Sequence, residues 1–198
     1  MAFWTQATTE PKRNYKFRVT LTGVSTGQQD AGASNILWWA KSVTTPSFDV
    51  SNVEHHHFDN RYYYPGRVTW NPISLVLVDP ITIDAADITV RMLANQGYQP
   101  GVSTEANKTK TINKSDATGT SSLGTVTIEV FDSNNNVVET WTLNNPFIES
   151  AKFGDLDYSN DDLKTIEMGI RYDWASFQGA GDGADERFVL SADNSTED

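Results

Sequence analysis

Residues 166–174 read Ile-Glu-Met-Gly-Ile-Arg-Tyr-Asp-Trp, and this stretch decides the fold class. Its large apolar side chains occupy every second position, and charged or small residues lie between them. Because successive side chains of a strand point to opposite faces, this period of two predicts a strand with one buried side. We expect a single long closing strand here, packed on one face against a core.

The same alternation recurs along most of the chain. Further strands are expected at Tyr15–Thr22, Ile36–Val43, 68–78 (interrupted at Asn71-Pro72), Thr125–Phe131, Val137–Leu143 and Phe147–Phe153. The turn-forming run Asp132–Asn136 separates two of these strands and predicts a β-hairpin. In contrast, Ser47–Asn60 alternates only weakly, and Pro65-Gly66 is typical of a turn.

One segment has the period of a helix instead. Ile81, Ala85, Ile88 and Met92 recur at steps of three or four residues, so they share one helical face. The preceding Asp79-Pro80 combines an acceptor at the N-cap with proline at the first helical position. Gly97 can end the helix in a left-handed conformation. A helix over about 81–96 is therefore expected.

These elements indicate a mainly β (α+β) fold. We expect a small antiparallel β-barrel or sandwich with one flanking α-helix, formed by a single domain over residues 1–177. Residues 178–198 are expected to form an acidic, flexible tail. The polar segments 23–34 and 98–123 are expected to be loops.

Charge and composition exclude several classes of function. The net charge is −11, and cysteine is absent, which removes disulfides, thiolate metal sites and cysteine nucleophiles. Residues 1–67 carry seven basic and five acidic side chains, whereas residues 68–198 carry eight and 21. Tight binding to nucleic acid needs the opposite sign, while head-to-tail self-association is favoured by such asymmetry. With no apolar run of spanning length and no signal peptide, we expect no membrane insertion and synthesis into the cytoplasm.

The sequence offers no convincing catalytic or metal site. His55 and His57 share one face of an extended strand and could both reach one metal ion. A zinc site needs further ligands, and the sequence has no histidine outside residues 55–57 and no cysteine. Asp132-x-Asn134-x-Asn136 resembles the start of a calcium loop but lacks its later ligands. Residues 179–183 alternate glycine without introducing a helix or a repeat. We therefore expect no enzyme activity, no metal and no cofactor.

Large aromatic side chains gather around the weakly patterned segment. Trp38, Trp39, Phe48 and the run Tyr62-Tyr63-Tyr64 lie on either side of it or within it. Such residues are common in protein cores and equally common at the energetic centres of protein interfaces. The residues alone leave both interpretations open.

In the order of its motifs, the chain resembles the tail-tube protein family of contractile-tailed bacteriophages, which is related to the tubes of other contractile injection systems. The matching motifs are Asn14–Val19, Lys41–Pro46 with its proline turn, Tyr64–Trp70 followed by Ile73–Val78, the helix, the strand pair and Ile166–Trp174. Together they cover most of residues 14–177.

The resemblance implies a structural subunit that forms hexameric rings. The rings would stack head to tail into the hollow inner tube of a virion tail, a conduit through which DNA passes during ejection. The implied partners are further copies of the chain, the tail sheath, baseplate or initiator proteins and a terminator. Because acidic residues predominate, we expect a negative lumen that repels phosphate and does not bind DNA specifically.

We expect the segment Lys41–Tyr64 to bridge neighbouring subunits or rings. The residues expected at this interface are Trp38, Trp39, Lys41, Pro46, Phe48, His55, His57, Tyr62, Tyr64, Pro65 and Gly66. The alternatives are a carbohydrate- or partner-binding β-sandwich module, the tube subunit of a non-viral contractile injection device, or a terminator or initiator ring of the same tail.

Overall fold

The computed structural model describes residues 11–22, 40–81, 85–98, 112–114, 123–159 and 161–179. The elements in these ranges are β1 (Phe17–Leu21), β2 (Ala40–Val43), β3 (Phe48–His57), β4 (Asn60–Trp70), β5 (Ile73–Val78), α1 (Ala85–Asn95), β6 (Val126–Phe131), β7 (Val137–Asn144), β8 (Phe147–Lys152), β9 (Thr165–Arg171) and β10 (Trp174–Gly179). The expected loop 23–34, most of the loop 98–123 and the tail beyond residue 179 lie outside the described residues.

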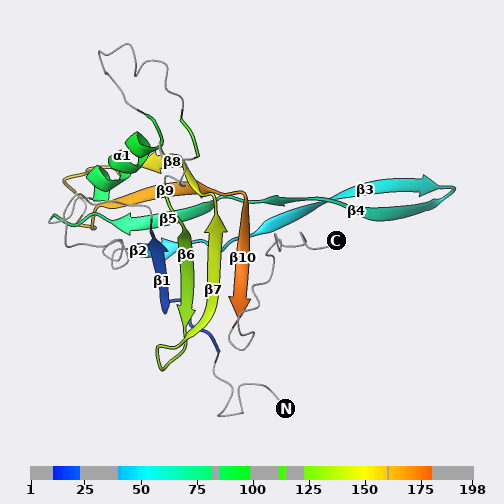
Figure 1. Ribbon diagram of the computed structural model, residues 1–198, viewed down its shortest axis with the longest axis horizontal. Coiled ribbons are helices and arrows are strands. Elements are labelled where there is room, and N and C mark those ends of the chain that lie inside the picture. The colour runs from blue at the N-terminus through cyan, green and yellow to red at the C-terminus, as the bar shows by residue number, and fades with distance from the viewer. Residues whose placement is uncertain are drawn as a thin grey trace, which may run out of the picture.

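The strands form two four-stranded sheets and a separate two-stranded hairpin. The first sheet has the order β1-β6-β7-β10, and the second has the order β2-β5-β9-β8. Every pair in both sheets is antiparallel. In Figure 1 the strands of the first sheet run across the direction of the second sheet. The mainly β, antiparallel fold with one helix is therefore confirmed.

The core lies between the two sheets and is closed on one side by α1. The first sheet contributes Val19, Leu21, Val126, Ile128 and Leu143, and the second contributes Ile73, Leu75, Leu77, Ile166, Met168 and Ile170. These side chains are at most 3% exposed, so nearly all their apolar area is removed from water. The period-two positions in the sequence are thus the positions that face the core.

The expected closing strand is in fact two strands in different sheets. β9 ends at Arg171 and pairs with β5 and β8, whereas β10 begins at Trp174 and pairs with β7. Tyr172 and Asp173 make the corner between them. The residues that face the core also change from even to odd numbers at this corner. Ile166, Met168 and Ile170 are buried in β9, whereas in β10 Ala175, opposite Leu143, is fully buried. The prediction of one continuous strand was wrong at this corner, since the alternation alone does not show a bend.

The helix is shorter than expected and begins later. Ile81 lies outside α1 and is fully exposed, so it is not part of the buried face. Pro80 is also outside the helix, and residues 82–84 are not described. The expected N-cap at Asp79 is therefore wrong, because the helix begins six residues later. Asp79 still contacts the helix start, since its Oδ1 accepts a hydrogen bond of 3.0 Å from the backbone N–H of Ala85.

The C-terminal end of α1 matches the expectation. Gly97 has a φ of 100°, and the N–H of Tyr98 donates to the carbonyl of Leu93 at 3.1 Å. This pattern closes the last turn and needs a residue that tolerates positive φ. On its buried side α1 contacts β9, where the Thr89 hydroxyl lies 3.6 Å from the sulfur of Met168.

Candidate assembly interface

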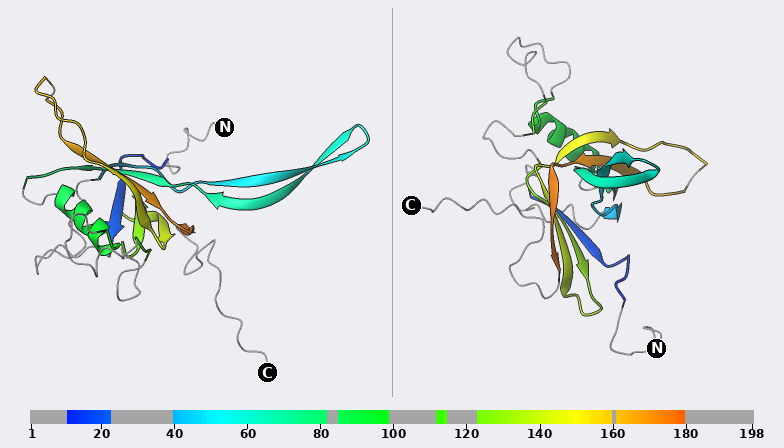
Figure 2. Two further views of the ribbon diagram at one scale, coloured as in Figure 1. Left: turned by 90° about the horizontal axis from the view of Figure 1, so that it is seen from above. Right: turned by 90° about the vertical axis from the view of Figure 1, so that its right-hand side faces the viewer.

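The hairpin formed by β3 and β4, here called the arm, projects away from the two sheets. It leaves the body in the direction of the second sheet and extends beyond every other described element, as Figure 1 and the left view of Figure 2 show. β3 has 10 residues, which corresponds to a reach of about 33 Å at 3.3 Å per residue. All of β3 is exposed, and so is all of β4 except Trp70.

Aromatic packing and hydrogen bonds fix the root of the arm to the body. The ring of Phe48 lies edge-on to Trp70 with centroids 5.2 Å apart, and Trp70 lies 6.0 Å from the buried Tyr172. Asn71 adds hydrogen bonds from its backbone N–H to the carbonyl of Ser47 at 2.9 Å and from its amide to Asp49 at 2.8 Å. The arm is therefore held at its base, whereas nothing in the described body covers its far half.

A β-bulge interrupts the arm where the sequence indicated a turn. Val50 pairs with Val68 and Asn52 pairs with Pro65, so β4 carries one residue more than β3 between these pairs. At this point the Ser51 hydroxyl accepts from the N–H of Arg67 at 2.8 Å. The expected Pro65-Gly66 turn is wrong: both residues lie within β4, and the chain reverses at Phe58-Asp59 instead.

The bulge moves the aromatic residues of β4 from one side of the arm to the other. Near the root, Phe48, Val50, Val68 and Trp70 share one face. Beyond the bulge that same face carries Glu54, His56, Arg61 and Tyr63, whereas the opposite face carries Val53, His55, His57, Tyr62 and Tyr64. The arm therefore presents two apolar areas, one near the root and one near the tip, on opposite sides.

The charged side of the far half is stabilised within the arm itself. Glu54 lies 3.4 Å from Arg61 across the hairpin and 3.6 Å from His56 two positions along β3. The exposed ion pair between Glu54 and Arg61 contributes at most about 1 kcal/mol. The opposite side, with Val53, Tyr62 and Tyr64, carries no charged partner for Glu54 and has the larger apolar area available for contact.

At the tip, Phe58 has an unusual backbone conformation. Its φ is 53°, in the left-handed region, and its side chain is 91% exposed. A non-glycine residue in this region costs about 1–2 kcal/mol. Its ring lies edge-on to that of its neighbour His57, with centroids 4.6 Å apart. An exposed aromatic ring in a strained turn is a candidate contact residue.

A groove lined by residues of both sheets lies near the base of the arm, on the side of β1 and β2. It has a volume of about 470 Å³ and an apolar floor formed by the half-buried Phe17, Val43 and Val130 together with the buried Ile128. The charged groups around it are Lys12, Arg13, Lys41 and Glu139, three cations and one carboxylate. We call this site the basic groove.

Glu139 does not neutralise the basic groove completely. Burial raises the pKa of Glu139, but hydrogen bonds from Lys12 and from the indole N–H of Trp141 outweigh this effect, so its pKa lies below its usual value. The carboxylate is thus ionised and paired with Lys12. With three cations and one carboxylate in its lining, the groove has a net positive charge.

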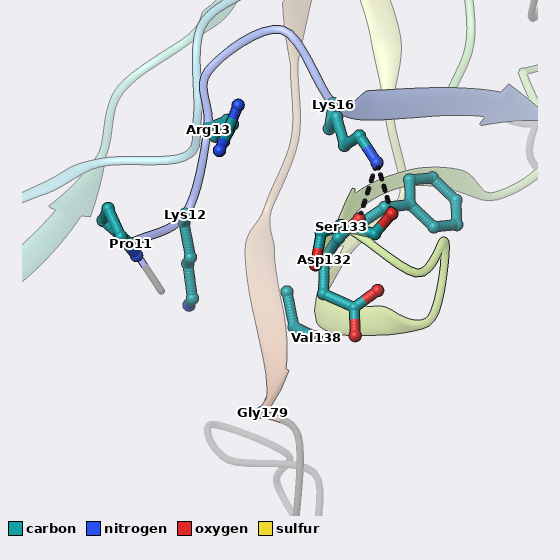
Figure 3. A pocket seen from close by; sticks show the side chains of 9 residues that line it. Pro11, Lys12, Arg13, Lys16, Asp132, Ser133, Val138 and Gly179 are labelled. Carbon is teal, nitrogen blue, oxygen red and sulfur yellow. Dashed lines mark hydrogen bonds between the residues drawn. The ribbon is translucent and has the colours of Figure 1, made fainter. Parts of the chain in front are cut away.

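A second cavity of about 330 Å³ adjoins the groove and shares Lys12 and Arg13 with it. Figure 3 shows how Lys16 closes it on one side, with its ammonium donating to the carbonyls of Asp132 and Ser133 at 3.0 Å. These bonds tie the start of β1 to the β6–β7 turn. The cation is used to hold the turn, which distinguishes this cavity from the basic groove.

The structure brings some of the expected interface residues together and separates others. His55, His57, Tyr62 and Tyr64 share one face of the arm, and Phe48 lies at the root on the other face. Lys41 is exposed on β2, and Pro46 is buried in the link to β3. Trp38 and Trp39 lie outside the described residues. Sequence reasoning missed Phe58 and Val53, because no pattern distinguishes them without the hairpin register.

Two other features, a metal site and a membrane-spanning helix, are not found in the described residues. The described residues contain no group of three or more metal-ligating side chains, and His55 and His57 point from an exposed strand. Among the described helices, none has the length and apolar character needed to cross a membrane.

Comparison with solved structures identifies the fold. No protein-family model matches the sequence, and no curated protein matches it. A chain of the anti-feeding prophage baseplate has a TM-score of 0.59 at 14% identity, with 87% of this chain and 99% of that chain covered. A chain of the tube-terminating cap of the same prophage gives 0.58 at 17%, covering 91% and 100%.

A chain of the sheath–tube complex of the extracellular contractile injection system PVC gives a similar result. Its TM-score is 0.57 at 16% identity, and the match covers 91% of this chain and 99% of that chain. At these identities the comparison establishes the fold and not the activity. The protein therefore shares its fold, over nearly the full length of both chains, with components of contractile injection particles.

Proposed function

We propose that this protein is a non-enzymatic structural subunit of the tube of a contractile particle. The observation that carries the proposal is the arm, a two-stranded hairpin with apolar side chains on both sides that its own body does not cover. An isolated hairpin is marginally stable in water, so it needs a partner surface. The shared fold with chains of contractile injection particles supports a further copy of the chain as that partner.

The sheet edges support self-assembly independently. In the described part of the chain, β1 and β10 end the first sheet, and β2 and β8 end the second. Edge strands carry backbone N–H and C=O groups that can pair with another strand. Pairing between copies around a ring would satisfy these groups and close the sheets into a continuous wall.

The finer features of the assembly follow from the resemblance seen in the sequence. The proposed rings are hexameric and stack head to tail, and the split of charge between residues 1–67 and 68–198 supplies two complementary ends. The anti-feeding prophage baseplate among the similar structures is described as six-fold symmetrised. Sheath, baseplate or initiator, and terminator proteins are the proposed partners, and a phage tail that ejects DNA is the proposed setting.

Assembly of the purified full chain at raised concentration tests the proposal. We expect rings or tubes in negative-stain micrographs and a mass by light scattering well above that of one chain. Replacing Asn52–Pro65 by Asn-Gly shortens the arm at the bulge and keeps its root. This variant should retain the circular dichroism of a folded monomer and lose tubes. A wild-type chain that stays monomeric at every concentration would contradict the proposed function.

A further inference from the structure

The tip of the arm and the basic groove are complementary surfaces on the same chain. Phe58 presents an almost fully exposed ring on a projecting turn, and the groove offers an apolar floor near the base of the arm. The ring of Phe58 is not part of the core, and the groove lies at the edge of the core, where Phe17 and Val43 are only partly buried. We infer that Phe58 of one copy inserts into the basic groove of another copy, an inference that rests on the proposed self-assembly.

The size of the groove fits this occupant. An apolar cavity of about 150 Å³ is sufficient to bind benzene. The groove, at about 470 Å³, has room for the phenyl ring of Phe58 and for part of the turn that carries it. Its floor is formed by Phe17, Val43 and two β6 side chains, which are suitable contacts for an aromatic ring.

The charges around the two surfaces are also complementary. Asp59 follows Phe58 in the turn, and the acidic Glu54 of the arm is already paired with Arg61. In the groove, Lys12 is paired with Glu139, and Lys41 adds an exposed cation at the rim. Insertion of Phe58 would bring the Asp59 carboxylate to this rim, where opposite charges fix the orientation of the contact.

The contact must be made between copies and not within one chain. The arm extends away from the sheets whose strands β1, β2 and β6 line the groove, so the tip lies far from its own groove (Figure 1). A projection on one side that fits a pocket elsewhere on the same molecule gives a heterologous contact. Repetition of such a contact produces a ring or an open helical assembly, as a tube requires.

Site-directed crosslinking tests the contact directly, because the chain has no cysteine of its own. The test variant combines Phe58→Cys with Ser42→Cys, an isosteric change on the groove lining. The matched control combines Phe58→Cys with Leu163→Cys, which is 73% exposed on the β8–β9 loop. Each variant is mixed with an equal amount of wild-type protein, which maintains assembly while leaving many variant copies next to one another. The mixture is then treated with a short bismaleimide and separated by denaturing electrophoresis.

We expect covalent dimers and higher multimers from the Phe58/Ser42 pair, in at least several-fold excess over the Phe58/Leu163 control. Equal yields from the two pairs, or multimers from the control alone, would overturn the contact. Wild-type tubes decide the proposed function separately. Tubes without a Phe58–Ser42 crosslink would reject only the docking of the tip, whereas a persistently monomeric wild type would reject both.

Discussion

Ser51 lies directly against Gly66 at the bulge of the arm. A Cβ atom on Gly66 would lie 2.3 Å from the Ser51 hydroxyl oxygen and 2.9 Å from its carbonyl oxygen. Only a residue without a side chain allows this approach of the two strands. The extra residue that Gly66 accommodates in β4 turns Tyr62 and Tyr64 to the side opposite Trp70. The contact thus decides which surfaces the arm presents to other molecules.

Gly66→Ala tests the bulge. The hydroxyl of Ser51 can rotate away, but the carbonyl is fixed in the backbone, so the strands must separate or change register. We expect tube formation to fall by an order of magnitude or more, with little change in the melting temperature of the body. Hydrogen exchange should be faster in the far half of the arm and unchanged in β5 and β9. If the Gly66→Ala variant formed tubes and exchanged hydrogen like the wild type, the bulge would not be needed for assembly.

Tyrosine substitutions on the two sides of the far half of the arm are expected to have different effects on assembly. Tyr62→Thr combined with Tyr64→Thr removes the aromatic side, while threonine keeps a favourable strand propensity. Loss of buried aromatic contacts at an interface commonly costs about 2 kcal/mol or more, so the critical concentration for assembly should rise more than about tenfold.

Tyr63→Thr is the matched control, since Tyr63 lies between them and points to the charged side. It should leave the critical concentration, measured by sedimentation, nearly unchanged. A larger effect of Tyr63→Thr than of the double variant would reverse the assignment of the contacting side.

Phe58→Gly separates the stability of the tip from its role in assembly. Glycine adopts a φ of 53° without penalty, so the folded monomer should not be destabilised and the turn should become more favourable by about 1 kcal/mol. Assembly should nevertheless decline, because the exposed ring is gone. Thermal unfolding and sedimentation of the same samples give the two readouts. Improved assembly of the glycine variant would mean that the ring serves only the turn.

The carboxyl group of Asp173 is expected to make the free energy of unfolding depend on pH in acid. Hydrogen bonds from Lys114 and Asn145 hold the pKa of this carboxyl below its usual value of 3.8. Because the folded state releases this proton more readily than the unfolded chain, the contribution is present above about pH 4 and is lost as the pH falls through the folded-state pKa. The side chain is 33% exposed, so solvent screening limits the effect to about 1 kcal/mol.

Asp173→Asn should therefore lower the free energy of unfolding at pH 6 and reduce its decline between about pH 4 and pH 2. Asp155→Asn, on the exposed β8–β9 loop, is the control. Urea titrations at several pH values provide the measurement. A parallel pH dependence for wild type and Asp173→Asn would exclude this carboxyl as a contributor.

Where one side of a strand is buried, the sequence predicted the structure well. The β6–β7 hairpin was expected from its alternation and from Asp132–Asn136. In the structure Asp132 accepts from the N–H groups of Asn134 and Asn136 at 2.8 Å, and Asn135 adopts a φ of 64°. Its turn chemistry is local, so a few neighbouring residues suffice to specify it.

The arm could not be predicted as a hairpin, because it lacks the one-sided burial that reveals a strand in the sequence. Neither of its faces is buried in the monomer, so no apolar period is maintained along Phe48–His57. The alternation also changes phase at the bulge, and Pro65-Gly66 resembles a turn although it lies within β4. The actual reversal uses Phe58-Asp59, which lacks the glycine or asparagine expected at a positive φ.

The sequence alone was enough to predict most strands of the two sheets, the approximate position of the helix and most core-facing residues, because burial on one face leaves a period that each segment carries locally. Only the folded chain shows the corner at Tyr172–Asp173, the opposed faces of the arm and the exposed position of Phe58 at its tip. These features depend on register and on backbone contacts between segments far apart in the chain, such as Ser51 and Gly66, and such contacts leave no periodic trace in the sequence.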